Sequence, residues 1–111
     1  MQVDSDGAAV VIRAGGEIDL ATAAAIPEAA LGVADIPSGA PVFIDLSEVE
    51  FMDSSGLRGL LQARRVIGDA GRPFALLRPS AAVCRVLDLV ALDDHLPVVG
   101  TTDDDGPAAQ G

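Results

Sequence analysis

The stretch Val42–Leu57, which reads VFIDLSEVEFMDSSGL, decides more about the fold than any other part of the chain. It opens with the unbroken apolar run Val42-Phe43-Ile44, which contains two β-branched residues. Such a run is typical of a strand covered on both faces, as in a parallel sheet. Polar residues from Asp45 onward predict that this strand ends near residue 46 and that a short loop follows.

A helix is predicted over 54–69, because apolar residues recur there at three- and four-residue spacing. These positions are Leu57, Leu60, Leu61, Ala63 and Ile67. Asp53 or Ser54 is the expected N-cap, since either side chain can accept from the free N–H groups of a first turn. Gly68 or Gly71 marks the expected end. Local chemistry alone favours a plain helix cap over a functional site at this point.

The rest of the chain alternates between strand and helix patterns. Strands are predicted at 8–12, 42–46, 74–77 and 96–99, with an edge strand at 2–5, and helices over 21–33, 54–69 and from Ser80 to about Leu89. Asp19 or Thr22 is the expected cap of the first helix, in which Pro27 predicts a late start or a kink. Alternation of this kind predicts an α/β domain with a mainly parallel sheet and right-handed crossovers. By itself it favours a doubly wound arrangement, with helices on both faces.

Composition excludes several classes of partner and cofactor. A formal net charge of −10 argues against nucleic acid and against anionic membranes, and it fits a basic surface on another protein. The single cysteine, Cys84, excludes an internal disulfide and offers no metal cluster, so we expect a buried, inert thiol. No cofactor is expected.

Segment boundaries and compartment also follow from the sequence. The segment 101–111 contains Asp103-Asp104-Asp105 and is predicted to be a disordered acidic tail, which leaves 1–100 as one domain. No apolar run approaches the roughly 20 residues of a membrane span. The N-terminus is polar and acidic, unlike a signal peptide. We expect a cytoplasmic protein.

An enzyme is the first alternative. Ser54 or Ser55 could be combined with His95 and an aspartate as a triad, but the chain lacks the G-x-S-x-G elbow of serine hydrolases. His95 is the only histidine and lies in Asp93-Asp94-His95, which is typical of a solvated turn. We therefore predict that the protein is not an enzyme and has no catalytic residue.

Three stretches resemble the STAS domain, specifically that of the bacterial anti-sigma factor antagonists. They are Gly16-Glu17-Ile18-Asp19, then Asp45-Leu46 through Phe51-Met52-Asp53-Ser54-Ser55-Gly56-Leu57, and Arg78-Pro79-Ser80 through Val83-Cys84-Arg85-Val86-Leu87-Asp88 to Leu92. The match covers about residues 8–99, and its middle stretch is highly specific. The resemblance implies a mixed, mainly parallel sheet of four or five strands with helices packed mainly on one side.

The resemblance also implies a function. Ser54 takes the position of the family's phosphoacceptor. An antagonist of this family binds an anti-sigma factor that is also a serine kinase, phosphorylation breaks the complex, and a serine phosphatase resets it. The implied partner-binding residues are Asp19, Asp53, Ser54, Ser55, Gly56, Leu57 and Arg58.

Two features of the sequence bear on this implied role. Arg58 departs from the family, in which many relatives have a small residue at that position, and Val90-Ala91-Leu92 replaces a glycine-containing helix end. The alternative is a STAS scaffold or signalling subunit that binds other proteins without control of a sigma factor.

Overall fold

The structure is a computed structural model that describes residues 1–5, 8–35, 39–90 and 98–99. In chain order the elements are β1 (Gln2–Ser5), β2 (Val10–Ile18), α1 (Ala25–Ala34), β3 (Val42–Met52), α2 (Ser54–Asp69), β4 (Phe74–Leu77), α3 (Ala81–Val90) and β5 (Val98–Val99). The predicted alternation of strands and helices is confirmed.

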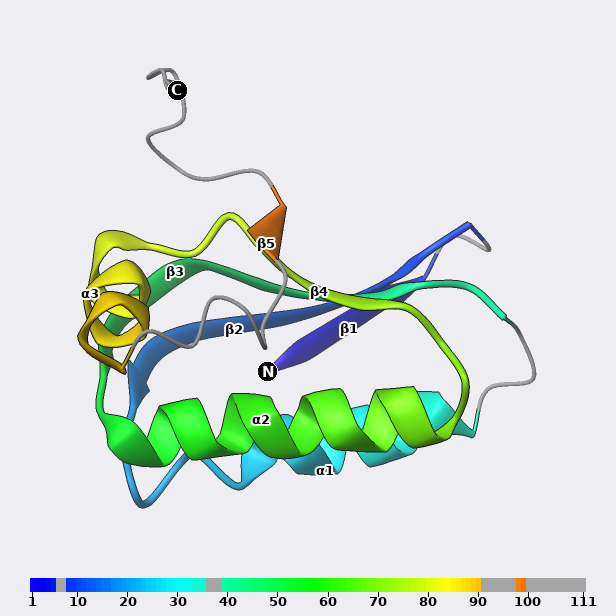
Figure 1. Cartoon of the computed structure of the whole chain (residues 1–111), viewed down its shortest axis with the longest axis horizontal. Helices are drawn as coiled ribbons and strands as arrows, with labels where there is room; N and C mark the ends of the chain where they lie inside the picture. The colour runs from blue at the N-terminus through cyan, green and yellow to red at the C-terminus, as the bar shows by residue number, and fades with distance from the viewer. Residues whose placement is uncertain (6–7, 36–38, 91–97, 100–111) are drawn as a thin grey trace.

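The five strands form one mixed sheet in the order β1-β2-β3-β4-β5. β1 is antiparallel to β2, and the other pairs are parallel. α1 and α2 lie side by side against one face, and α3 stands at one end of the sheet (Figure 1). The one-sided arrangement is confirmed and the doubly wound expectation is wrong. The strand order does not reverse from β2 through β3 to β4, so right-handed crossovers place α1 and α2 on the same face.

The core lies between the sheet and the α1–α2 layer. Side chains from the strands and from both helices meet there with no solvent exposure. The completely buried ones include Ile12, Ile44, Leu46 and Leu76 from the sheet and Ile26, Leu60 and Ile67 from the helices.

β3 is longer than predicted, because it runs to Met52 rather than ending near residue 46. Its second half pairs with an equally extended β2, with register shifts on either side of Gly15-Gly16. Along this half Leu46, Val49 and Met52 remain buried while the polar residues between them face outward. Pairing with a distant strand therefore keeps a polar segment extended, and the expected loop does not form.

α1 begins late, at Ala25, with Pro27 in its first turn, as one of the two alternatives predicted. Its expected cap is wrong. Ala24 is the N-cap and makes no side-chain bond. Asp19 and Thr22 stabilise the preceding loop instead. Asp19 Oδ1 accepts from the Ala21 N–H at 3.0 Å, and Thr22 Oγ1 accepts from the Asp19 N–H at 3.0 Å.

The other helix ends follow the predictions. Gly71, with φ of +75°, follows the end of α2, and Ser80 Oγ accepts from the Val83 N–H at 3.3 Å at the start of α3. Cys84 is half-buried rather than fully buried. Several predictions fall outside the described residues. They concern the tail 101–111, His95, and residues 91, 92, 96 and 97.

Within the ranges that the structure describes, no helix is both long and apolar enough to cross a membrane.

Candidate functional site

Asp53 links the end of β3 to the first turn of α2 and caps the helix as predicted. Its backbone is extended, and its Oδ1 atom accepts from the Ser55 N–H at 2.9 Å and from the Gly56 N–H at 3.3 Å. The Leu57 N–H donates to the Asp53 carbonyl oxygen at 3.2 Å. Three amides of the first turn are thus bonded to Asp53.

Ser54 is the first residue of α2, and its side chain is exposed, whereas Ser55 is only partly exposed. A hydroxyl in this position is open to an approaching protein. Of the two serines in the motif, Ser54 therefore offers the more accessible oxygen for acylation or phosphorylation.

Asp19 lies near Ser54, although the two are far apart in the sequence. β2 and β3 are parallel and end together, with Ile18 paired to Met52. The Asp53 N–H donates to the Ile18 carbonyl oxygen at 3.3 Å, which joins the two strand ends. The loop that begins with Asp19 is therefore brought beside the start of α2, at the carboxyl edge of the sheet.

Two of the predicted partner-binding residues, Gly56 and Leu57, lie beneath this surface. Leu57 is 6% exposed and belongs to the core. A Cβ atom on Gly56 would lie 2.7 Å from Met52 Cγ and 2.9 Å from Ile18 Cγ2. Gly56 thus lets α2 start close against the strand ends. Any contribution of these two residues to binding comes from holding the surface in place.

The accessible part of the site is what we name the Ser54 surface, made of Asp19, Leu20, Ser54, Ser55 and Arg58. Leu20 is 82% exposed. It lines a surface depression with Ser55, Arg58 and neighbouring residues of α2. Sequence reasoning missed Leu20. Its signal was an apolar side chain directly after Asp19, in a stretch that was predicted to start a helix.

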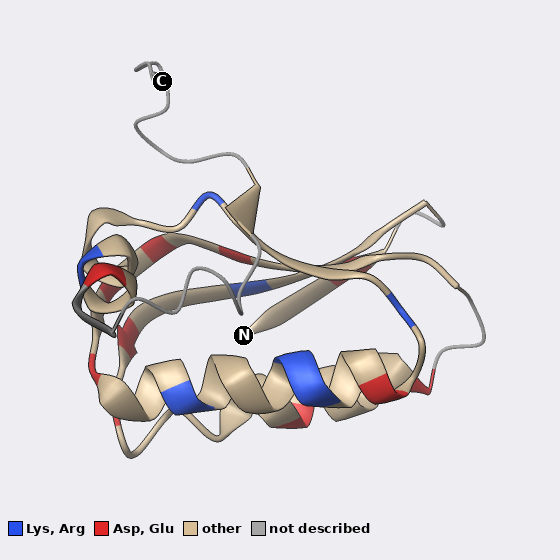
Figure 2. Cartoon of the chain, viewed as in Figure 1, with Lys and Arg blue, Asp and Glu red and all other residues tan. Residues whose placement is uncertain are grey.

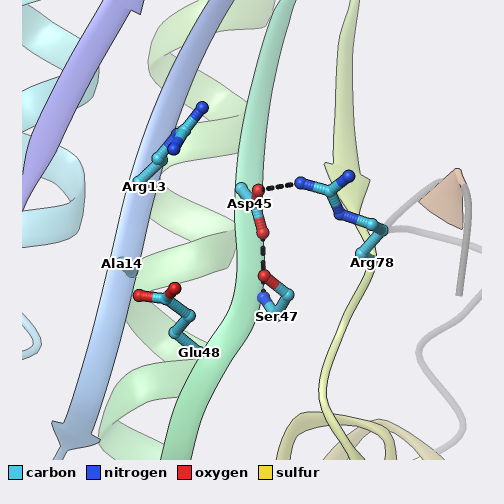
Figure 3. Close-up of a pocket in the computed structure, with 6 residues that line it drawn as sticks. All are labelled: Arg13, Ala14, Asp45, Ser47, Glu48 and Arg78. Carbon is cyan, nitrogen blue, oxygen red and sulfur yellow. Dashed lines mark hydrogen bonds and ion pairs between the residues drawn. The ribbon is translucent and has the colours of Figure 1, made fainter. Parts of the chain in front are cut away.

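A second polar cluster lies on the sheet, where Asp45 and Ser47 of β3 meet Arg78 just after β4 (Figure 3). The Asp45 side chain is 6% exposed and forms an ion pair with Arg78 Nη2 at 2.5 Å. Its Oδ1 atom also accepts from the Ser47 N–H at 2.9 Å. Sequence reasoning missed this cluster because it ended the strand near residue 46 and so placed Ser47 in a loop.

The surroundings of Asp45 lower its pKa. Burial raises the pKa of the carboxyl group, but hydrogen bonds from the Ser47 backbone and hydroxyl, together with the Arg78 guanidinium, outweigh burial. The net pKa lies below the ordinary value of 3.8. Ionised Asp45 therefore stabilises the fold above that pH, and the stabilisation is lost as the pH falls through the lower pKa of the folded state.

We expect Arg78→Ala to lower the free energy of unfolding at pH 7 by about 1–2 kcal/mol, because it leaves a buried carboxylate without its cation. The deficit relative to wild type should shrink as the pH falls below 3.8 and through the lower pKa at which Asp45 of the folded wild type becomes protonated. Denaturant unfolding at several pH values measures both effects.

Arg78→Gly is the matched control, because Arg78 has a φ of +47° that glycine adopts without strain. The glycine variant should be more stable than the alanine variant by about 1 kcal/mol. A deficit of Arg78→Ala that stays constant through acid would contradict the role assigned to the ion pair.

The described residues contain no group of three or more His, Cys, Asp or Glu side chains placed to hold a metal ion.

Comparison with known proteins places this geometry in a family. A family model described as "Mlab, STAS domain" matches residues 1–100. The anti-sigma-F factor antagonist RsfB of Mycobacterium tuberculosis is 40% identical over 103 residues, which cover 91% of this chain and 80% of that protein.

Solved structures agree. An anti-sigma factor antagonist from Mycobacterium paratuberculosis matches with a TM-score of 0.77 and 32% identity, over 93% of this chain and 86% of the other. The anti-sigma factor antagonist SpoIIAA in its unphosphorylated form shares the fold, with a TM-score of 0.72 and 24% identity over 94% and 90% of the two chains. The strand order, the one-sided helices and these matches together show that the chain belongs to the STAS domain family.

Proposed function

We propose that this protein is an anti-sigma factor antagonist that works by partner switching in the cytoplasm. The observation that supports this most directly is the exposed Ser54 hydroxyl at the capped start of α2, beside the Asp19 loop. The 40% identity to a protein named as an anti-sigma-F factor antagonist supports the same function.

In the proposed cycle, the unmodified protein binds an anti-sigma factor that is also a serine kinase, and so frees its sigma factor. The kinase transfers the γ-phosphoryl group of ATP to Ser54 Oγ, and ADP and the hydroxyl proton are released. The phosphorylated protein leaves the complex. A serine phosphatase then hydrolyses the phosphate ester with water and restores the hydroxyl group.

The physics of the Ser54 surface supports such a switch. In the unmodified protein it presents a neutral hydroxyl near the exposed apolar side chain of Leu20. A phosphate adds about −1.5 to −2 charges and binds water strongly. A partner packed against the hydroxyl would have to accommodate this group without offering it a cation of its own. A loss of about 3 kcal/mol would weaken binding roughly a hundredfold, and no change of fold is needed.

We expect Ser54→Ala to bind the anti-sigma partner about as tightly as wild type and to resist release by ATP, because the residue stays small and neutral. Ser54→Asp should bind at least roughly tenfold more weakly, which corresponds to about 1.4 kcal/mol. Calorimetry at one salt concentration measures these affinities, and circular dichroism verifies that each variant is folded.

Ser55→Ala is the matched control, since Ser55 is the adjacent hydroxyl. With kinase and ATP, phosphate incorporation should persist in Ser55→Ala and disappear in Ser54→Ala. Equal affinities of the Ala, Asp and phosphorylated forms would exclude Ser54 as the switch. Undiminished incorporation in Ser54→Ala would exclude it as the acceptor.

A further inference from the structure

We propose that Arg58 forms an ion pair with the phosphate on Ser54. Phosphorylation then adds an anion to the Ser54 surface and also engages Arg58, so that this cation is no longer available to a partner. This inference rests on the proposed function, because it concerns the phosphorylated state of Ser54.

The first argument is that the helix backbone has little left to offer a phosphate. Asp53 Oδ1 already accepts from the Ser55 and Gly56 N–H groups, and the Leu57 N–H donates to the Asp53 carbonyl oxygen. None of these three amides is therefore free to donate to a phosphate on Ser54. A phosphate could use the Ser55 and Gly56 amides only by displacing the cap, so a side-chain cation is the better partner.

The second argument is the position of Arg58. It follows Ser54 by four residues on α2, and side chains with this spacing are neighbours on one helix face. Side chains on a helix also lean towards its N-terminus. Arg58 contributes to the depression that Leu20 and Ser55 line, at the N-terminal end of α2. Both Ser54 and Arg58 are exposed, so a phosphate and a guanidinium can meet there.

The third argument is that Arg58 is available. Elsewhere in the described chain Arg13 pairs with Asp4, Arg78 pairs with Asp45, and Arg72 donates to two backbone carbonyl oxygens. No ion pair involves Arg58 within the described residues. The sequence of α2 contains no acidic residue before Asp69. Figure 2 shows basic segments along α2 and an acidic segment near the C-terminal end of this helix.

The fourth argument is the balance of charge at the site. Asp53 lies directly before Ser54, and Asp19 lies in the adjoining loop. Both carboxylates oppose a phosphate. Arg64 and Arg65 share the helix, but Arg65 is seven residues beyond Arg58, a rise of about 10 Å along the axis. Arg58 is therefore the cation of α2 that lies nearest to Ser54.

The pairing has a consequence for the partner. An acidic group of the partner that pairs with Arg58 in the unmodified complex would lose this ion pair when the phosphate binds Arg58. Phosphorylation would then weaken the complex at two points of the Ser54 surface, not one.

The test uses full-length protein carrying genetically encoded phosphoserine at position 54, so that neither kinase nor partner is needed. The second pKa of the phosphate, ordinarily about 6, is measured by ³¹P NMR titration. Arg58→Gln should raise this pKa by about 0.4 pH unit, as expected for an exposed pair one helical turn apart. Arg58→Lys should retain most of the wild-type value, and the difference should fade in about 1 M salt.

Arg65→Gln is the matched control, because it removes the same charge from the same helix at a greater distance. It should leave the phosphate pKa within about 0.1 pH unit of wild type, since water and salt screen the longer separation. Equal pKa values in wild type and Arg58→Gln would overturn the inference, and so would equal shifts in Arg58→Gln and Arg65→Gln. Neither result would bear on whether a kinase uses Ser54, which the phosphate-incorporation experiment with Ser54→Ala and Ser55→Ala decides.

Discussion

Gly59→Ala should lower the free energy of unfolding by about 2 kcal/mol, although alanine is the better helix former. A Cβ atom at Gly59 would lie 2.9 Å from the carbonyl oxygen of Ala23. That oxygen already accepts from the Ile26 N–H at 3.1 Å, so it cannot move without disturbing the start of α1. α2 and the loop before α1 would have to separate, and the Ser54 surface would widen.

Gly68→Ala is the matched control, with the same substitution in the same helix. Apart from its chain neighbours and the backbone of its own helix, no atom lies within 4 Å of a Cβ at Gly68, and the residue is exposed. This substitution should leave the free energy of unfolding unchanged or raise it by up to about 1 kcal/mol. Urea unfolding gives the free energies of unfolding of the two variants for comparison, and partner affinity is measured in parallel. Similar stabilities for Gly59→Ala and Gly68→Ala would show that α2 does not need this close approach.

Arg72→Met should lower the free energy of unfolding by about 3 kcal/mol, the largest effect that we expect from an exchange outside the apolar core. Arg72 is 6% exposed, and it follows α2 at the end of the domain remote from Ser54. Its Nε atom donates to the Ala40 carbonyl oxygen at 2.9 Å, and Nη1 donates to the Val33 carbonyl oxygen at 2.5 Å. Hydrogen bonds from a charged donor contribute roughly 1.5–3 kcal/mol each, and methionine keeps the bulk without the bonds.

The control is Arg85→Met, since Arg85 is exposed on α3 and forms no ion pair within the described residues. That exchange should change stability by less than about 0.5 kcal/mol. The melting temperature should fall by about 12–24 °C for Arg72→Met, given about 4–8 °C per kcal/mol in a domain of this size. A fall no greater than that of Arg85→Met would mean that the buried guanidinium does not hold α1 to the segment before β3.

Several features were predictable because they depend on residues close together in the chain. The apolar spacing of α2 and its Asp53 cap depend on neighbours within one or two helical turns, and both are confirmed. The late start of α1 follows in the same way from Pro27. These local signals placed Ser54 at the start of a helix without reference to the rest of the molecule, and the structure shows that its side chain is exposed.

Only the tertiary structure decided the features that depend on distant pairing. β3 stays extended through Ser47 and Glu48 because β2 pairs with it, which brings the Asp45 carboxylate to Arg78 after β4. The same parallel pairing ends β2 and β3 together and so brings Asp19 and the exposed Leu20 to α2. The sequence by itself therefore determined which residues form α2 and its N-terminal cap. Strand pairing decided which surface surrounds it, because contacts between distant segments leave no local pattern in the chain.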